Sequence, residues 1–238
     1  TSSISNDLNF SSNYFFSEKG FKNNFEILFK NVNTIGKKSA LYESSPQSEL
    51  ISSYIYNASF PLVKNTLDTL NKIEPKFSFR FNPHDMKDNK EQNRRLDVDN
   101  VFNNNRLALS DTYEGGESVT LGLNFTKDKI NTKDKIDEFD RYLDLKLATV
   151  FRFNEEKNIP TTSTLNKKRS NVFGKFGFTP SKNFSIDYNF SVTNDLNELE
   201  YNSIVTSGNY KNFTTEFEYF KEGGIIGDAN MIENISSY

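Results

Sequence analysis

The feature that most constrains the fold is an alternation of apolar and polar residues that recurs along the chain. In the clearest run, from Phe184 to Val192, every second residue is Phe, Ile, Tyr or Val, and Ser, Asp or Asn fill the positions between. Similar runs lie at 25–29, 54–60, 77–81, 119–125 and 143–153. A period of two places alternate side chains on opposite faces of a β-strand and does not fit a helix. The pattern predicts an all-β fold.

The composition indicates where such strands lie. Aromatic residues make up 14% of the chain, with 23 Phe and no Trp, yet the mean hydropathy is −0.68. A disordered chain of this polarity is poor in aromatics. Strands with one lipid-facing side and one wet side reconcile the two facts. We therefore predict an antiparallel transmembrane β-barrel segment, with about ten strands of a larger outer-membrane barrel.

The connections between the runs differ in length. Short turns are predicted at 179–183, 194–197 and 207–209, where Pro, Asn and Gly favour a bend. Long polar loops are predicted near 82–111 and 153–171. Short turns at one end and long loops at the other are typical of an outer-membrane barrel.

The start of the chain, Thr1-Ser2-Ser3, has neither the basic region nor the apolar core of a signal peptide. We expect residues 1–238 to be part of a single barrel domain that is truncated at both ends. A soluble β-sandwich is the alternative, because its strands alternate in the same way. Several runs here reach about nine residues, which is the length of a tilted strand that crosses a bilayer.

Chemically reactive residues are scarce. The chain has no Cys and one His, His84, which lies beside Asp85 in a predicted loop. Without a second His or a Cys, a metal site would need several carboxylates to converge from elsewhere. The 29 basic and 32 acidic residues provide no broad basic field for nucleic acid. We expect no enzymatic activity, no metal and no cofactor.

Three stretches carry a family resemblance. The first, Ile73 to Met86, includes Pro75 and Arg80. The second, Asp99 to Leu123, is the most distinctive and includes Asn105, Arg106, Asp111, Glu114, Gly115 and Gly116. The third runs from Arg169 to Gly174. Together they resemble the C-terminal barrel domain of the LptD (OstA/Imp) family of lipopolysaccharide-assembly proteins. The second stretch departs from the family pattern at Leu107, Ala108-Leu109 and Thr112.

The resemblance implies an outer-membrane protein that transports lipopolysaccharide and inserts it into the outer leaflet. It implies as partners lipopolysaccharide, membrane lipid, a plug lipoprotein of the LptE type and the periplasmic proteins of a lipopolysaccharide bridge. The family's periplasmic jellyroll and its lateral-gate strands are expected to lie outside this chain. The residues of the motifs are expected to have a structural role.

The alternation also predicts which polar side chains face a barrel lumen, opposite the Phe and Leu of the lipid face. The candidates are Lys146, Arg152, Lys175, Asp187, Glu216 and Glu218. They either contact lipopolysaccharide or the plug, or simply solvate a wet interior. Two other classes stay open, a generic porin or outer-membrane transporter and a soluble β-sheet binding module.

Overall fold

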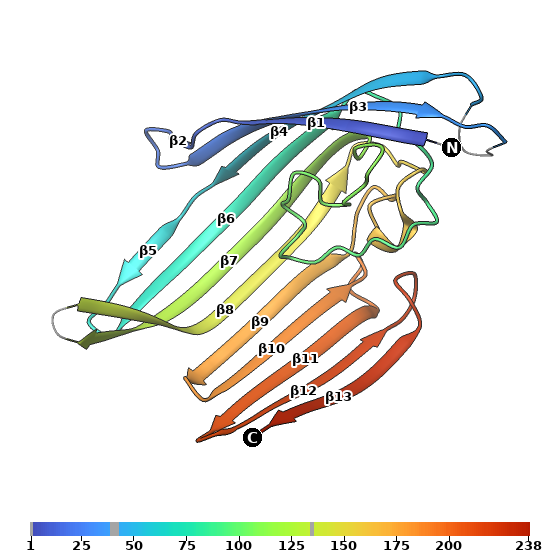
Figure 1. Ribbon diagram of the computed structural model, residues 1–238. Helices are drawn as coiled ribbons and strands as arrows, with labels where there is room; N and C mark the ends of the chain where they lie inside the picture. Colours follow the sequence, from blue (N-terminus) through green and yellow to red (C-terminus); the bar gives the residue numbers. More distant parts are fainter. Residues whose placement is uncertain (1, 39–42, 134–135) are drawn as a thin grey trace.

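The computed structural model describes residues 2–38, 43–133 and 136–238. Within these residues the chain forms one antiparallel sheet (Figure 1). Its thirteen strands are β1 Ser2–Ser11, β2 Phe15–Phe16, β3 Lys22–Ile35, β4 Gln47–Ser59, β5 Leu62–Asn65, β6 Thr69–Asn82, β7 Gly116–Lys133, β8 Ile136–Arg152, β9 Val172–Ser181, β10 Phe184–Val192, β11 Leu199–Tyr210, β12 Phe213–Glu222 and β13 Ala229–Ser237.

The sheet is a meander in which successive strands are neighbours. The order is β1-β3-β4-β6-β7-β8-β9-β10-β11-β12-β13, and the short strands β2 and β5 pair with β3 and β6. The prediction of an all-β antiparallel fold is confirmed, with more strands than the ten or so expected. Strands β1 and β13 form the two edges of the described sheet, and Figure 1 shows it open between them.

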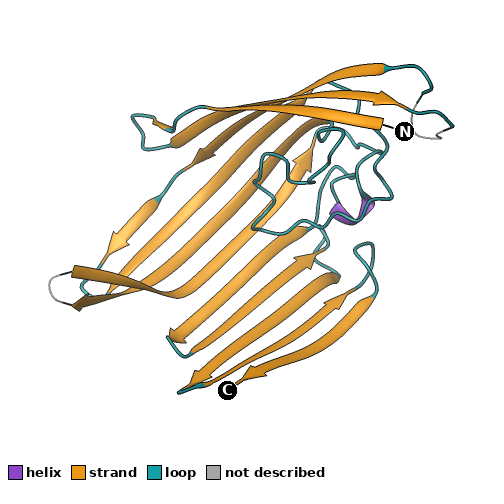
Figure 2. Cartoon of the chain, in the orientation of Figure 1, coloured by secondary structure: helices purple, strands orange, loops and turns teal. Residues whose placement is uncertain are grey.

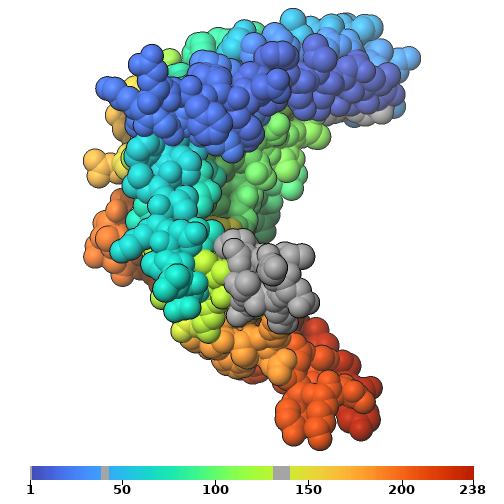
Figure 3. Space-filling view, turned by 90° about the vertical axis from the view of Figure 1, so that its left-hand side faces the viewer, coloured from blue at the N-terminus to red at the C-terminus, as the bar shows by residue number. Residues whose placement is uncertain are grey.

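The two faces of the sheet differ in shape and in chemistry. In profile the sheet is bent and hollowed on one side (Figure 3). Register places Lys30, Ile55, Arg80, Ser118 and Arg152 on the hollow side, which we call the concave face. The opposite, convex face carries the Phe, Tyr and Leu of the alternating runs, among them Phe29, Tyr54, Phe81, Leu145 and Phe176.

Two long connections cover part of the concave face. Residues 83–115 join β6 to β7, and residues 153–171, with one short 3-10 helix at Thr161–Ser163, join β8 to β9 (Figure 2). Their apolar side chains pack on the sheet in a dry cluster made of Met86, Leu96, Val101, Leu107, Leu109, Ile159 and Leu165 from the loops and Ala148, Val150 and Phe173 from β8 and β9. The largest apolar cluster among the described residues therefore lies between loops and sheet.

A second cluster fixes the same loop near the N-terminal strands. Tyr113 packs against Leu28, Val32, Ile51 and Ile55 on the concave face of β3 and β4. Hydrogen bonds also link the two loops, since the backbone N–H of Asn89 donates to the carbonyl of Asn158 at 2.9 Å. The loops form one unit that is packed against the sheet.

The connections between the C-terminal strands, β9 to β13, are shorter. The turn predicted at 194–197 is confirmed, between β10 and β11, at the same end of the sheet as the long connections. The turn predicted at 207–209 is wrong, because β11 continues to Tyr210 and the hairpin turns at Lys211, whose φ is 54°. Gly208 instead pairs with Thr215 inside the sheet.

The turn predicted at 179–183 is shorter than expected. Strand β9 includes Thr179 and Pro180, and only Lys182 and Asn183 lie between β9 and β10. The register shifts between Phe184 and Ile186 at this point. A bulge is a place where a sheet tolerates proline, because the ladder hydrogen bond is already interrupted.

The packing of Phe190 generates a stability prediction. Its ring lies over Gly174, so that a Cβ built at Gly174 would overlap the ring. We expect Gly174→Ala to lower the free energy of unfolding by about 1–3 kcal/mol through overpacking. Denaturant titration measures this, with Gly208→Ala as the control, since a Cβ there would meet Thr215 at an ordinary 3.7 Å. Equal effects of the two substitutions would contradict the prediction.

Candidate functional site

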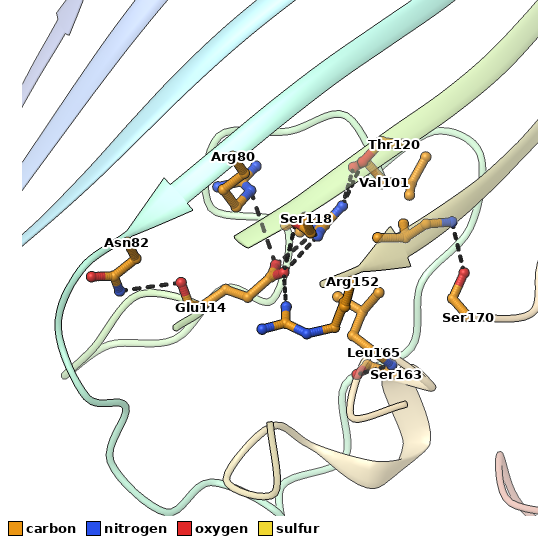
Figure 4. A network of polar contacts seen from close by, with 12 residues as sticks. Arg80, Asn82, Val101, Glu114, Ser118, Thr120, Arg152, Ser163, Leu165 and Ser170 are labelled. Carbon is orange, nitrogen blue, oxygen red and sulfur yellow. Dashed lines mark hydrogen bonds and ion pairs between the residues drawn. The ribbon is translucent and has the colours of Figure 1, made fainter. Parts of the chain in front are cut away.

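The most elaborate polar structure on the concave face lies where β6, β7 and β8 meet the loop 83–115. Register aligns Arg80 of β6, Ser118 of β7 and Arg152 of β8 in one row across the three strands. The loop returns into β7 through Glu114, which lies beside this row, and Arg106 comes from the loop itself. Arg80 and Arg152 both point toward Glu114 (Figure 4).

The carboxylate of Glu114 binds two of these arginines directly. Arg106 donates from Nε to Oε2 at 2.7 Å and from Nη2 to Oε1 at 2.6 Å, and Arg152 donates from Nη1 to Oε1 at 2.6 Å. The Nε of Arg80 lies 4.0 Å from Oε2. All four side chains are at most 5% exposed. The two-point contact with Arg106 is the strong form of a charged hydrogen bond.

The remaining arginine donors are also used, with one exception. Arg106 donates to Thr120 Oγ1 at 2.8 Å and to Ser118 Oγ at 3.0 Å. Arg80 donates through Nη1 and Nη2 to the carbonyls of Asn104 and Asn103, whereas its Nε has no hydrogen bond in the described structure. Buried charges are tolerated when their hydrogen bonds are satisfied in this way. The cluster therefore joins three strands to two points of the loop.

The cluster carries three guanidinium groups and one carboxylate. Burial by itself would raise the pKa of Glu114, but the charge and hydrogen bonds of Arg106, followed by the charges of Arg152 and Arg80, outweigh it and lower the pKa from 4.5 to about 2. Glu114 is therefore ionised at neutral pH. Removing its charge would leave three buried cations without their common partner.

Two glycines let the chain enter β7 at this point. Gly116 has a φ of +74°, which a residue with a side chain adopts only with strain, and a Cβ there would lie 3.0 Å from Nη2 of Arg152. The carbonyl of Gly115 accepts a hydrogen bond from the same Nη2. A Cβ at Gly115 would lie 3.0 Å from the Cβ of Met86. The glycine pair thus lets the backbone approach Arg152.

The structure brings together five of the eight motif residues. Arg80, Arg106, Glu114, Gly115 and Gly116 meet in the cluster, whereas Pro75, Asn105 and Asp111 lie outside it. The carbonyl of Pro75, in β6, accepts from the backbone N–H of Phe60 at 3.0 Å. Asn105 donates to the carbonyl of Leu109 at 3.2 Å. The Oδ1 of Asp111 is buried without a hydrogen-bond partner in the described structure.

The six predicted lumen-facing residues share the concave face. Lys146 lies opposite Lys175 in register, and Asp99 from the loop binds Lys146 at 2.7 Å and lies 3.7 Å from Lys175. Asp187 is 3.8 Å from Lys175. Arg152 belongs to the Glu114 cluster, and Glu216 accepts a hydrogen bond from Ser207 at 3.1 Å. Glu218 lies opposite Val205 on the same face. That this face lines a lumen stays a prediction.

Sequence reasoning missed several ion pairs that tie the loop to the sheet. Lys30, only 2% exposed, donates to Asp7 of β1 at 2.7 Å and to the carbonyl of Ser110 at 3.0 Å. Near the opposite edge of the sheet, Arg95 of the loop pairs with Glu222 of β12 and lies over the ring of Tyr201. Only the alternation places Lys30 on the polar face, and nothing in the sequence identifies its partners.

His84 lies in the loop after β6. Its Nε2 is 3.1 Å from the Oγ of Ser52, and its side chain is exposed. Among the residues that the structure describes, no group of three or more His, Cys, Asp and Glu side chains is placed to hold a metal ion. No helix in the same part of the chain is both long and apolar enough to cross a membrane.

The fold and the cluster define a class of protein: a long antiparallel meander with one apolar and one polar face, in which two loops are anchored on the polar face by buried charge. The family model of LPS transport system D, LptD, matches residues 29–231. The chain belongs to this family of lipopolysaccharide transport proteins. No curated protein sequence matches it.

The geometry of the cluster predicts the effect of removing its negative charge. We expect Glu114→Gln to lower the free energy of unfolding by about 3–5 kcal/mol, because breaking a buried ion pair leaves uncompensated buried charge. Denaturant titration at neutral pH measures this. Glu117→Gln is the control, because Glu117 lies three positions away on the opposite, convex face of β7, opposite Phe81.

The pH dependence tests whether charge is the cause. Because the pKa of Glu114 is depressed in the folded protein, its stabilisation is fully present above about pH 4.5 and is lost as the pH falls toward about 2. The stability difference between the native protein and Glu114→Gln should therefore shrink in that window. A difference that stays constant with pH would show that packing, and not ionisation, explains the loss.

Proposed function

We propose that this chain is part of the wall of an outer-membrane β-barrel, the C-terminal barrel region of an LptD (OstA/Imp) protein, which inserts lipopolysaccharide into the outer leaflet. The observation that carries the proposal is the two-faced sheet: an exposed apolar convex face behind a polar concave face, in a chain of a lipopolysaccharide transport family. Residues 1–238 then form part of one barrel domain.

The convex face supports contact with lipid. Apolar side chains from five strands of this face, β7, β8, β9, β11 and β12, are between 37% and 44% exposed, namely Leu121, Phe151, Phe176, Ile204 and Phe217. An apolar surface of this extent indicates a membrane or another apolar partner. A soluble β-sandwich would cover this face with a second sheet, and the described residues form one sheet only.

The two ends of the strands support an orientation. The long connections 83–115 and 153–171 leave from one end, and the two-residue turns at 182–183 and 211–212 lie at the other. In outer-membrane barrels the long loops lie outside the cell and the short turns face the periplasm. The loops of this chain then lie toward the cell surface and fold back onto the lumen wall.

The edge strands support closure by further strands. Within the described sheet, β1 and β13 each have a neighbour on one side only. Unpaired backbone groups cost several kcal/mol each in hydrocarbon, so that a sheet in lipid must close on itself. Further strands of the same protein would close it, and the lateral gate would lie among them.

The protein has no chemical step in this proposal and is not an enzyme. Its partners are lipopolysaccharide, membrane lipid, a plug lipoprotein of the LptE type and periplasmic bridge proteins. A generic porin would share the two-faced sheet. It is not favoured, because the loops here bury the concave face of β8 and β9 instead of leaving it to solvent.

The proposed transport is tested by depleting the protein in its native cell and measuring surface lipopolysaccharide, for example by its accessibility to an enzyme that modifies lipid A at the cell surface. Surface lipopolysaccharide should fall while lipopolysaccharide accumulates behind the outer membrane. Unchanged surface lipopolysaccharide with a loss of solute permeability would favour a porin.

The lipid-facing assignment predicts the effect of a buried charge. We expect Leu145→Arg, at the middle of β8 on the convex face, to destabilise the protein in lipid by about 2–4 kcal/mol. Unfolding in phospholipid vesicles measures this. The control is Val205→Arg on the concave face, where register places Val205 between Asp187 and Glu218. If both substitutions have an effect near zero, the convex face does not contact lipid.

A further inference from the structure

A recess opens on the concave face beside the covered region. It has a volume of about 240 Å³ and is formed by β3, β4 and β6. Phe102 of the loop 83–115 lines one part of it, and Tyr14 of the segment between β1 and β2 lines another. A volume of this order lies below the usual range for whole ligands, so it suits one small unit of a longer molecule.

Hydrogen-bonding groups gather at the base of the recess. Glu26 Oε1 accepts from the side-chain nitrogens of Asn57 at 2.9 Å and Asn24 at 3.3 Å. These contacts fix the orientation of both amides. The Oδ1 of Asn57 is buried and has no hydrogen-bond partner in the described structure. A buried acceptor without a partner is costly, and a donor on a bound molecule would satisfy it.

The charges around the recess balance. Lys22 and Lys76 line it together with Glu26 and Glu74, so that the ionisable groups of the lining sum to zero. Glu74 also pairs with Lys72 at 2.7 Å. Two carboxylates at the lining oppose the entry of a phosphate, and both lysines are already engaged with aromatic rings. Lys76 lies 4.1 Å from the ring centre of Phe102, and Lys22 lies 3.8 Å from that of Tyr14.

The position of Phe102 depends on a glycine. A Cβ built at Gly122 would lie 2.6 Å from Cζ of Phe102, which is too close for two carbon atoms. Because Gly122 has no side chain, the tip of the Phe102 ring rests on β7 at Gly122, which pairs with Lys76 of β6. The ring is thereby held as a firm apolar wall next to a polar base.

Fixed amide and carboxylate groups, aromatic walls and no net charge are the chemistry that recognises a neutral polyhydroxylated ligand. A hydroxyl has one O–H donor and two acceptor lone pairs, so one sugar hydroxyl can donate to Oδ1 of Asn57 while a neighbouring hydroxyl donates to a carboxylate. We propose that this recess binds one uncharged sugar unit of a saccharide chain. The proposal rests on the proposed function, since the saccharide of lipopolysaccharide is the source to which this face would be exposed.

Binding of a dephosphorylated oligosaccharide prepared from lipopolysaccharide tests the proposal. The full-length protein in detergent micelles is titrated with this probe by calorimetry. We expect Asn57→Leu and Phe102→Ala each to weaken binding at least about tenfold, which corresponds to 1.4 kcal/mol. The matched control is Asn189→Leu, the same change on the concave face of β10, opposite Lys175 and away from the recess. It should bind as the native protein does.

Any one of three results overturns the saccharide site. These are that the native protein does not bind the probe, that both recess variants bind it as tightly as the native protein does, or that inorganic phosphate competes with it. Correct folding of each variant is checked by its resistance to denaturant. Binding is measured on purified protein and transport in cells, so the two proposals fail separately. A protein that transports lipopolysaccharide but does not bind the probe overturns the saccharide site alone.

Discussion

The carboxylate of Glu114 is the interaction on which the arrangement of this chain depends. It binds Arg106 of the loop and Arg152 of β8, with Arg80 of β6 beside them, and all four side chains are buried. Such a cluster forms only when three strands are in register and the loop has returned to them. Each arginine is costly to bury alone, so the cluster favours a single loop conformation over its alternatives. The two glycines that follow Glu114 serve the same geometry, because they let the backbone meet Arg152.

Once the loop is fixed there, its apolar side chains have a defined surface to cover. Leu96 and Val101 belong to the apolar cluster that packs on β8 and β9, whereas Tyr113 packs on β3 and β4. The loop is thus packed along much of the width of the sheet, and Arg95 extends its contacts to β12. The apolar side chains of the convex face are exposed, so no core is built on that face of the described sheet. The loops form an apolar core on the concave face instead. The packing of these loops therefore both stabilises the protein and determines the shape of the concave surface.

The sequence predicted the parts of the fold that depend on local pattern. Alternation from Phe184 to Val192 matches β10 residue for residue, because a period of two is a property of neighbouring positions. The prediction of a turn at Gly208 was wrong, because a glycine in a strand and a glycine in a turn cannot be told apart from the sequence alone. The Glu114 cluster could not be predicted from the sequence for another reason. Arg80 and Arg152 meet through the register of β6, β7 and β8, and a shift of one residue would turn them to the convex face. The motif that carries Arg106 and Glu114 was visible, but its partners on the sheet were not.

The charges of the concave face are mostly paired within the protein. Lys146 and Lys175 share Asp99, Lys30 binds Asp7, and the recess beside Phe102 has balanced charge. A path for a long polar molecule must bind it well enough for entry and weakly enough for exit, as ion pores do. A wall of unpaired cations would hold a phosphorylated saccharide too tightly to release it. Internal pairing removes that trap and leaves hydrogen bonds to sugar hydroxyls as the main attraction. If this face lines the route of lipopolysaccharide, the pairing of its charges within the protein is what allows the saccharide to pass.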